Sequence, residues 1–201
     1  MNKEAVELAI KMNIVNHHLY RGQDLGEMTS KAGYEYVFAG NGVFLRCDTP
    51  IIKGAFKIAH IKIASLCPFK DVGITLKIPK ISGALLTEIC KEVVSGSKKE
   101  SFYQVKRISD SAYAVVKPSQ ESGEEWVKYK NADPKDVVAE IHSHPDMEAF
   151  YSSGDDDDEQ GSKIYGVIGW YSKEEVTMRF RIGVYGHWVE VAAEDVFSCV
   201  E

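Results

Sequence analysis

The chain of 201 residues carries 44% hydrophobic and 27% charged side chains, which is ordinary for a soluble globular protein and unlike a disordered or collagen-like chain. Its formal net charge of −6 at pH 7 excludes a general nucleic-acid-binding surface, because phosphate contacts need clustered Lys and Arg. No apolar run approaches the about 18 residues of a membrane span, and the acidic Glu4 stands where a signal peptide would be basic. We therefore expect a cytoplasmic protein with one domain, or one domain with an appended region.

The four cysteines, Cys47, Cys67, Cys90 and Cys199, lie far apart in the sequence and include no C-x-x-C pair. Neither a disulfide framework nor a cysteine-based zinc site fits that distribution. The sequence therefore predicts reduced thiols, most of which serve as small packing residues.

Residues 1–78 are expected to form a β-rich N-terminal region. Apolar residues at helical spacing over residues 1–15 predict one helix with a wide apolar face. The alternating pattern over residues 34–46 then predicts a β-hairpin, in which Asn41 and Gly42 supply the positive φ angles of a tight turn.

Short apolar runs interrupted by Lys, Pro and Gly predict further strands and turns over residues 51–76. Within that stretch, residues 56–66 also fit a helix, and the pattern does not decide between the two. The clearest helix of the chain follows at residues 80–95. Pro79 suits its first turn, and Gly96 stands where a left-handed cap is favoured.

The remaining residues, 79–201, predict an α/β domain. Residues 119–135 are polar and rich in turn formers, so they predict a loop. A last extended stretch is expected to end near Val200. The strands are expected at residues 101–108, 112–118, 137–141, 164–171 and 176–184.

The most informative residues follow the strand at 137–141. Because alternate residues of a strand face the same side, His142 and His144 can present both imidazoles to one point. Ser152 and Asp155 are three residues apart, a spacing that puts both side chains on one side of a first helical turn. Two imidazoles and one carboxylate, with a fourth position open, form the ligand set expected of catalytic zinc.

Each of these residues also has a simpler interpretation. His142 and His144 fit two hydrogen-bonded strand histidines. Asp155 begins a run of four aspartates that fits a solvated helix start stabilised by the helix dipole, with Asp158 as the nearest substitute ligand. Ser152 fits a helix N-cap.

The pattern resembles the JAMM motif of the MPN-domain zinc metalloproteases, which is an upstream Glu, then H-[ST]-H-P, a Ser separated from the second His by seven residues, and an Asp three residues further on. The whole downstream part is present as His142, Ser143, His144, Pro145, Ser152 and Asp155. The hairpin near Gly42, the start of the helix after Ile78 and the segment 183–188 are also similar to bacterial JAMM proteins of plasmid-type PRTRC cassettes. The resemblance covers most of the chain, although only the metal motif is specific. It implies the cytidine-deaminase-like α/β fold of JAMM/MPN domains for residues 79–201, in which a mixed, curved sheet carries the site and helices flank it.

The upstream Glu has two candidates. In the family it follows the first helix of the domain and begins the next strand, which is the place of Glu100. Glu140 competes because it stands two residues before His142. A strand that carried both histidines and the general base would have to aim three side chains at one metal, so Glu100 is favoured. Glu88 and Glu92 lie within the helix and are expected to face solvent.

The resemblance also implies a mechanism. Zn2+ bound by His142, His144 and Asp155 lowers the pKa of a bound water towards 7. Glu100 then takes the proton of that water and delivers it to the leaving amine. Ser152 donates a hydrogen bond to the oxyanion of the tetrahedral intermediate, and Ser143, on the opposite face of the strand, is expected to be structural.

The substrate that the resemblance implies is an amide or isopeptide bond after the tail of ubiquitin or a ubiquitin-like protein, and an E1-like enzyme of the same cassette is a possible partner. Packing is the expected role of the nearby aromatic residues, although they also suit a groove for such a tail. The acidic run Asp155–Glu159 would favour a basic tail or a leaving lysine. The aromatic residues are Trp126, Tyr129, Phe150 and Tyr151.

Two other functions compete with the isopeptidase. A non-catalytic MPN-type scaffold is the main alternative, but such members usually lack ligands and this sequence lacks none. A nucleoside deaminase would need H-x-E and P-C-x-x-C, and neither pattern occurs in the sequence.

Overall fold

The chain is described by a computed structural model that covers residues 15–96, 99–123, 126–130, 134–172 and 175–199. The helix predicted over residues 1–15 lies outside these residues, apart from Val15. The chain divides into two compact units, Met1–Lys77 and Ile78–Glu201, one residue before the boundary expected from the sequence. Within the described part of the chain, no helix is long and apolar enough to cross a membrane.

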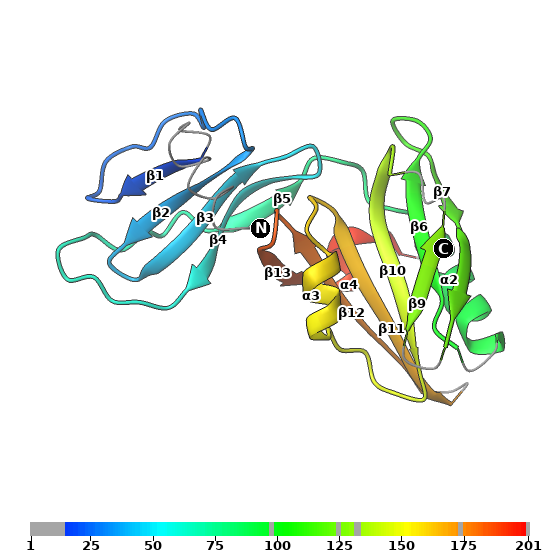
Figure 1. The fold of residues 1–201 in the computed structure, drawn as a ribbon. Coiled ribbons are helices and arrows are strands. Elements are labelled where there is room, and N and C mark those ends of the chain that lie inside the picture. The colour runs from blue at the N-terminus through cyan, green and yellow to red at the C-terminus, as the bar shows by residue number, and fades with distance from the viewer. Residues whose placement is uncertain (1–14, 97–98, 124–125, 131–133, 173–174, 200–201) are drawn as a thin grey trace. The chain divides into compact units, whose positions relative to one another are not determined.

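The first unit contains a five-stranded sheet with the strands in sequence order (Figure 1). β1 pairs with β2 in parallel, and the other neighbours are antiparallel. A small apolar cluster that includes Val37, Phe44 and Phe69 packs on one face. The helical alternative for residues 56–66 is wrong, because the chain stays in β4 to Ala59 and residues 60–66 form turns and irregular structure. The strands are β1 Asn16–Leu19, β2 Tyr34–Ala39, β3 Gly42–Asp48, β4 Ile52–Ala59 and β5 Gly73–Leu76.

The predicted hairpin is present as β2 and β3, with Ala39 opposite Gly42. Its turn works differently from the prediction, because only Gly42 has a positive φ, of 150°. Asn41 acts through its side chain, which donates to the Phe69 carbonyl oxygen at 2.9 Å and accepts from the Phe69 N–H at 2.8 Å. The amide thus ties the tip of the hairpin to a distant segment of the chain.

The four cysteines are free thiols, but only Cys47 is buried and Cys90 is half-buried. Cys67 and Cys199 are exposed, so the prediction of packing thiols is wrong for these two. Desolvation by burial raises the pKa of the Cys47 thiol to about 12 and also raises the pKa of Cys90.

Thiol labelling is expected to divide the cysteines accordingly, because the thiolate is the reacting form and burial disfavours the thiolate of Cys47. At about pH 8, Cys67 and Cys199 should react with a disulfide-exchange reagent within minutes, while Cys47 should react only after denaturation. Mass spectrometry of labelled peptides measures the order. Fast labelling of Cys47 in the folded protein would contradict its burial.

The second unit contains a six-stranded mixed sheet in the order β13-β12-β11-β10-β6-β7. β10 and β11 are parallel, and the remaining neighbours are antiparallel. The α/β architecture with a mixed sheet flanked by helices is therefore confirmed. The strands are β6 Phe102–Arg107, β7 Tyr113–Val116, β10 Val137–Pro145, β11 Ile164–Ser172, β12 Glu175–Gly183 and β13 Trp188–Val191.

The loop predicted over residues 119–135 instead contains a separate two-stranded hairpin, β8 Ser119–Ser122 and β9 Val127–Lys130. The prediction failed because β8 has no buried residue and so lacks the apolar alternation that reveals a strand. The hairpin is joined to the main sheet near the start of β6, where the Glu100 N–H donates to the Gly123 carbonyl oxygen at 2.9 Å.

The predicted helix is present as α2, Gly83–Ser95, and begins three residues later than expected. Ile81 precedes it in extended conformation and exchanges main-chain hydrogen bonds with Val196 and Ser198. That pairing keeps Ile81 out of the helix and buries it completely. Gly96 has φ −77° and ψ −169°, so the left-handed cap predicted there is wrong.

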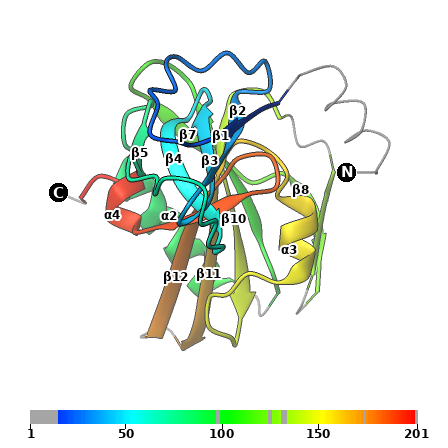
Figure 2. The same cartoon turned by 90° about the vertical axis from the view of Figure 1, so that its left-hand side faces the viewer.

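Two short helices complete the second unit, α3 Ser153–Asp158 and α4 Ala193–Val196. Phe180 of β12 packs on Phe197, directly after α4, with ring centroids 5.0 Å apart. Its neighbour Arg181 bonds to residues of α3 and its C-cap, and successive strand residues face opposite sides. α3 therefore covers one face of the sheet, while α2 and α4 cover the other (Figures 1 and 2).

Candidate metal centre

The structure brings His142, His144 and Asp155 together on the α3 face of the sheet. Both histidines project from β10 and are buried, and Asp155 lies in the first turn of α3. His142 Nε2 is 3.1 Å from His144 Nε2 and 3.2 Å from Asp155 Oδ1. Three potential ligand atoms from two segments thus converge within 4.8 Å of one another.

Two of the three separations among these atoms are close to those around a tetrahedral zinc ion. Zinc held at about 2.0–2.1 Å from nitrogen and oxygen keeps its ligand atoms about 3.3 Å apart, close to the 3.1 Å and 3.2 Å found here. Burial lowers the pKa of both His142 and His144, which favours the neutral imidazole that binds metal. The positions and the neutral form of the two histidines are therefore compatible with metal binding.

Ser152 determines which oxygen of Asp155 faces the histidines. It is the N-cap of α3, and its Oγ accepts from the Asp155 N–H at 3.2 Å. Asp155 Oδ2 in turn accepts from the Ser152 N–H at 2.6 Å and from the Ser152 hydroxyl at 2.8 Å. This capping box holds Oδ2 and leaves Oδ1 directed at His142. The N-cap interpretation of Ser152 is thus correct, and the cap itself orients the carboxylate.

Glu100 lies beside His144, one of the three potential ligands. Its side chain is buried, and Oε1 is 3.8 Å from His144 Nε2. The adjacent Ser101 is held by Ser143, whose Oγ accepts from the Ser101 N–H at 2.9 Å and whose N–H donates to the Ser101 carbonyl at 3.0 Å. Ser143 therefore has the structural role expected for it, and it fixes the main chain next to Glu100.

The competing carboxylate, Glu140, is already paired. Its Oε1 accepts from Lys163 Nζ at 2.7 Å and from Gln104 Nε2 at 3.3 Å. Glu88 and Glu92 both lie on the exposed side of α2, as expected, and Glu92 forms an exposed pair with Lys117. Of the two candidates for the upstream Glu, Glu100 is therefore the one whose carboxylate lies near a motif histidine.

A cavity of about 450 Å³ opens over these residues. Trp126 and Phe150 are large apolar side chains of its wall that remain 48% and 40% exposed. The Phe150 ring also lies 4.6 Å from the His144 ring, centroid to centroid. The side chain of Tyr129 lies outside the described residues. The other apolar wall residues are Phe102, Val127 and Met147, and the acidic ones are Glu100, Glu140, Asp155, Asp158 and Glu159.

The four acidic residues that follow Asp155 in the run Asp155–Glu159 divide into two groups. Asp156 and Glu159 are ion-paired with Arg181 at 2.7 Å and 2.6 Å, whereas Asp157 and Asp158 are exposed. Burial raises the pKa of Glu159, and the charge of Arg181 opposes that rise. The run is therefore only partly a solvated surface, and sequence reasoning missed Arg181. A polar residue between the buried Phe180 and Ile182 was the available signal.

Gly169 of β11 allows the segment before the motif serine to cross the sheet. It pairs with His144, and a Cβ built on it would overlap the main chain of residues 147–149. That segment leads directly to Phe150 and Ser152. The glycine therefore helps to set how closely the motif residues Ser152 and Asp155 approach β10.

Gly169→Ala is accordingly expected to lower the free energy of unfolding by about 1–3 kcal/mol, the usual cost of overpacking, and to weaken metal binding. Gly154→Ala is a matched control for stability, because a Cβ there meets only Ser152 Oγ at 3.5 Å and alanine favours a helix by up to about 1 kcal/mol. Denaturant unfolding measures both variants. Equal stability of Gly169→Ala and wild type would contradict the close approach.

The chain is similar to one protein family and to solved structures. The family model described as prokaryotic homologs of the JAB domain matches residues 83–183, half of the chain, including every motif residue from Glu100 to Asp155. No curated protein matches the sequence. The solution structure of protein DSY2949 from Desulfitobacterium hafniense is similar at a TM-score of 0.41 and 14% identity, covering 55% of this chain and 87% of that one. The family match shows that the chain belongs to the prokaryotic homologs of the JAB domain.

Proposed function

We propose that this chain is a zinc metallopeptidase that hydrolyses an amide or isopeptide bond after the tail of a ubiquitin-like protein. The observation that carries the proposal is the convergence of His142, His144 and Asp155, with the buried carboxylate of Glu100 3.8 Å from His144. Membership of the JAB-domain family supports the same chemistry, since JAMM proteins that use zinc belong to it.

The ligands and the base have separate roles in this proposal. Zn2+ held by His142, His144 and Asp155 would act as a Lewis acid and lower the pKa of water in the site. Glu100 accepts the proton of the attacking water and returns it to the leaving amine, so one carboxyl serves as general base and then as general acid. Its burial beside His144 keeps it within reach of the same small volume as the ligands.

Ser152 has two roles that alternate during the reaction. In the free enzyme its hydroxyl donates to Asp155 Oδ2, and a hydroxyl has only one proton to donate. To stabilise the oxyanion it must release that bond, while the Ser152 N–H continues to hold Asp155 Oδ2. An oxyanion donor of this kind contributes about 3–4 kcal/mol to the transition state.

The walls of the cavity offer both apolar and acidic contacts to the side chains of a tail. Trp126 and Phe150 offer exposed apolar walls near the metal ligands, and Asp158 adds a negative charge to the same cavity. These features favour a tail that carries both apolar and basic side chains. An E1-like enzyme that acts on the same ubiquitin-like protein is the expected functional partner.

Metal analysis and a cleavage assay test the proposal together. The purified protein should contain about one zinc per chain and should release the fused partner from a ubiquitin-like fusion. Treatment with 1,10-phenanthroline should stop cleavage, and added Zn2+ should restore it. A folded chain that takes up no zinc would instead support the non-catalytic scaffold. A chain that binds zinc but cleaves none of a panel of fusions would refute the proposed substrate class.

A further inference from the structure

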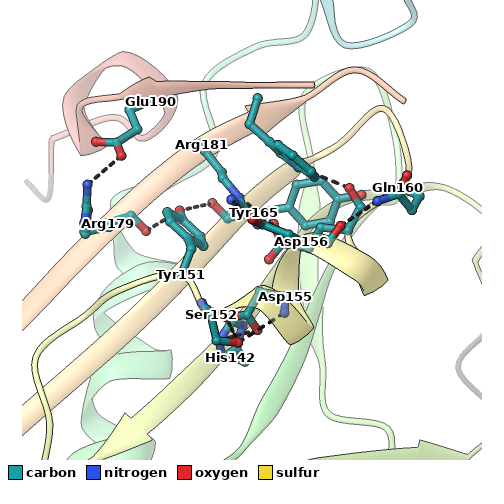
Figure 3. Close-up of polar contacts among 12 residues, drawn as sticks. His142, Tyr151, Ser152, Asp155, Asp156, Gln160, Tyr165, Arg179, Arg181 and Glu190 are labelled. Atoms are coloured by element: carbon teal, nitrogen blue, oxygen red, sulfur yellow. Dashed lines mark hydrogen bonds and ion pairs between the residues drawn. The ribbon is translucent and has the colours of Figure 1, made fainter. Parts of the chain in front are cut away.

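Arg181 is a buried cation next to the candidate metal centre, although it is no part of the motif. Arg181 is only 5% exposed to solvent. From β12 it reaches the α3 face of the sheet, where it meets the segment that carries Ser152 and Asp155 (Figure 3). A buried guanidinium is costly unless its charge and hydrogen bonds are satisfied, so its partners identify what it holds in place.

The partners of Arg181 lie before and after the motif residues Ser152 and Asp155 in the sequence. Before them, the Tyr151 ring stacks on the guanidinium, with its centroid 3.8 Å from the central carbon. After them, Asp156 Oδ1 accepts from Nη1 at 2.7 Å and Glu159 Oε2 accepts from Nε at 2.6 Å. The Trp188 ring lies 4.6 Å from the guanidinium carbon. Arg181 thus contacts the segment 151–159 at three points around Asp155.

α3 has few other means of staying in place. It has only six residues, none of them buried and none basic, so it lacks both an apolar face and a charge to balance its four aspartates. A helix this short is unstable in isolation, because helices below about 12 residues are marginal in water. The capping box fixes the start of α3, and Arg181 supplies ion pairs in its first turn and at its C-cap.

We propose that Arg181 is a positioning residue of the metal centre, which holds α3 so that Asp155 Oδ1 stays beside His142 Nε2. The planar guanidinium suits this role, because it can bind two carboxylates and stack on aromatic rings at the same time, whereas a lysine ammonium is a point charge. The inference rests on the proposed function for the identity of the ligand, and it adds a residue to which the motif gives no role.

Three variants test the role of Arg181. Arg181→Met removes the charge and the planar fork, Arg181→Lys keeps the charge alone, and Asp156→Asn removes one ion pair at a half-exposed position. Arg179→Met is the matched control, because Arg179 lies on the same face of β12 but pairs with Glu190 at 2.5 Å. Figure 3 shows this second pair apart from α3.

Zinc affinity, measured by chelator competition, is the first readout. Loss of an outer partner of a metal site typically costs 10–100-fold in affinity. Arg181→Met should therefore weaken zinc binding by about 10–100-fold and Asp156→Asn by less. Arg181→Lys should recover part of the loss, and Arg179→Met should stay within about threefold of wild type. The absorption spectrum of bound Co2+ should change in Arg181→Met but not in Arg179→Met.

Amide hydrogen exchange of the metal-free protein is the second readout. The N–H groups of Asp156 and Glu159 bond to the carbonyls of Ser152 and Asp155, and they should exchange at least about tenfold faster in Arg181→Met.

Wild-type zinc affinity in both Arg181→Met and Asp156→Asn would overturn the inference and leave the proposed function intact. A folded wild type without zinc affinity would overturn the proposed function. In that case unchanged exchange in α3 would overturn the positioning role as well. If Arg181→Met does not fold, Asp156→Asn and Arg181→Lys give the same comparison.

Discussion

Glu100→Gln is expected to bind zinc as the wild type does and to lose peptide-bond hydrolysis by about 10²- to 10⁴-fold, the usual contribution of a general acid–base group. The amide keeps the size of the side chain, so the cavity should be unchanged, but it cannot accept the proton of water. Metal content and the kcat of fusion cleavage measure the two effects separately. Unchanged kcat in this variant would show that Glu100 is not the base.

Glu140→Gln is the matched control for that experiment, because it removes a carboxylate from the wall of the same cavity. Glu140 is bound to Lys163 and Gln104, so its loss should reduce stability by leaving the half-buried Lys163 without its partner, and hydrolysis should remain. The opposite result, with hydrolysis lost in Glu140→Gln and kept in Glu100→Gln, would assign the base to Glu140.

His144→Ala is expected to abolish zinc binding and, with it, all hydrolysis. The variant keeps only His142 and Asp155 of the three proposed ligands. Its loss of zinc affinity should exceed the about 10–100-fold that follows when a hydrogen bond to a metal ligand is removed. Equilibrium dialysis or chelator competition measures the affinity, and circular dichroism checks that the chain is folded. Zinc bound by His144→Ala with wild-type affinity would exclude this histidine as a ligand.

Ser143→Ala provides the control on the same strand. Ser143 lies one residue away on the opposite face and bonds to Ser101 rather than to the ligands. Its loss should lower the free energy of unfolding by about 1 kcal/mol, the net contribution of one hydrogen bond, and should leave zinc affinity unchanged. Because the Ser143 side chain fixes the main chain beside Glu100, kcat should fall in this variant although zinc affinity does not.

The elements that the sequence predicted correctly are those with a strong local pattern. The strand around Tyr34 partly alternates buried and half-buried residues, whereas the strands around Ile141 and Ile168 are nearly continuous buried runs. Both patterns are visible in the local sequence. The errors fall where a distant segment overrides the local preference. Ile81 fits the helical pattern, but main-chain bonds to residues around Phe197 draw it into extended conformation. β8 lacks a buried face and owes its existence to pairing with β9.

By itself the sequence determined the two local halves of the site. Alternation along a strand places His142 and His144 on one face, and i to i+3 spacing at a helix start joins Ser152 to Asp155. Only the tertiary structure decided that these halves meet, that Glu100 lies beside His144, and that Arg181 pairs with Asp156 of α3. The physical reason is that strand and helix geometry acts over a few residues, whereas the distance between β10, α3 and β12 depends on side-chain packing between segments far apart in the chain.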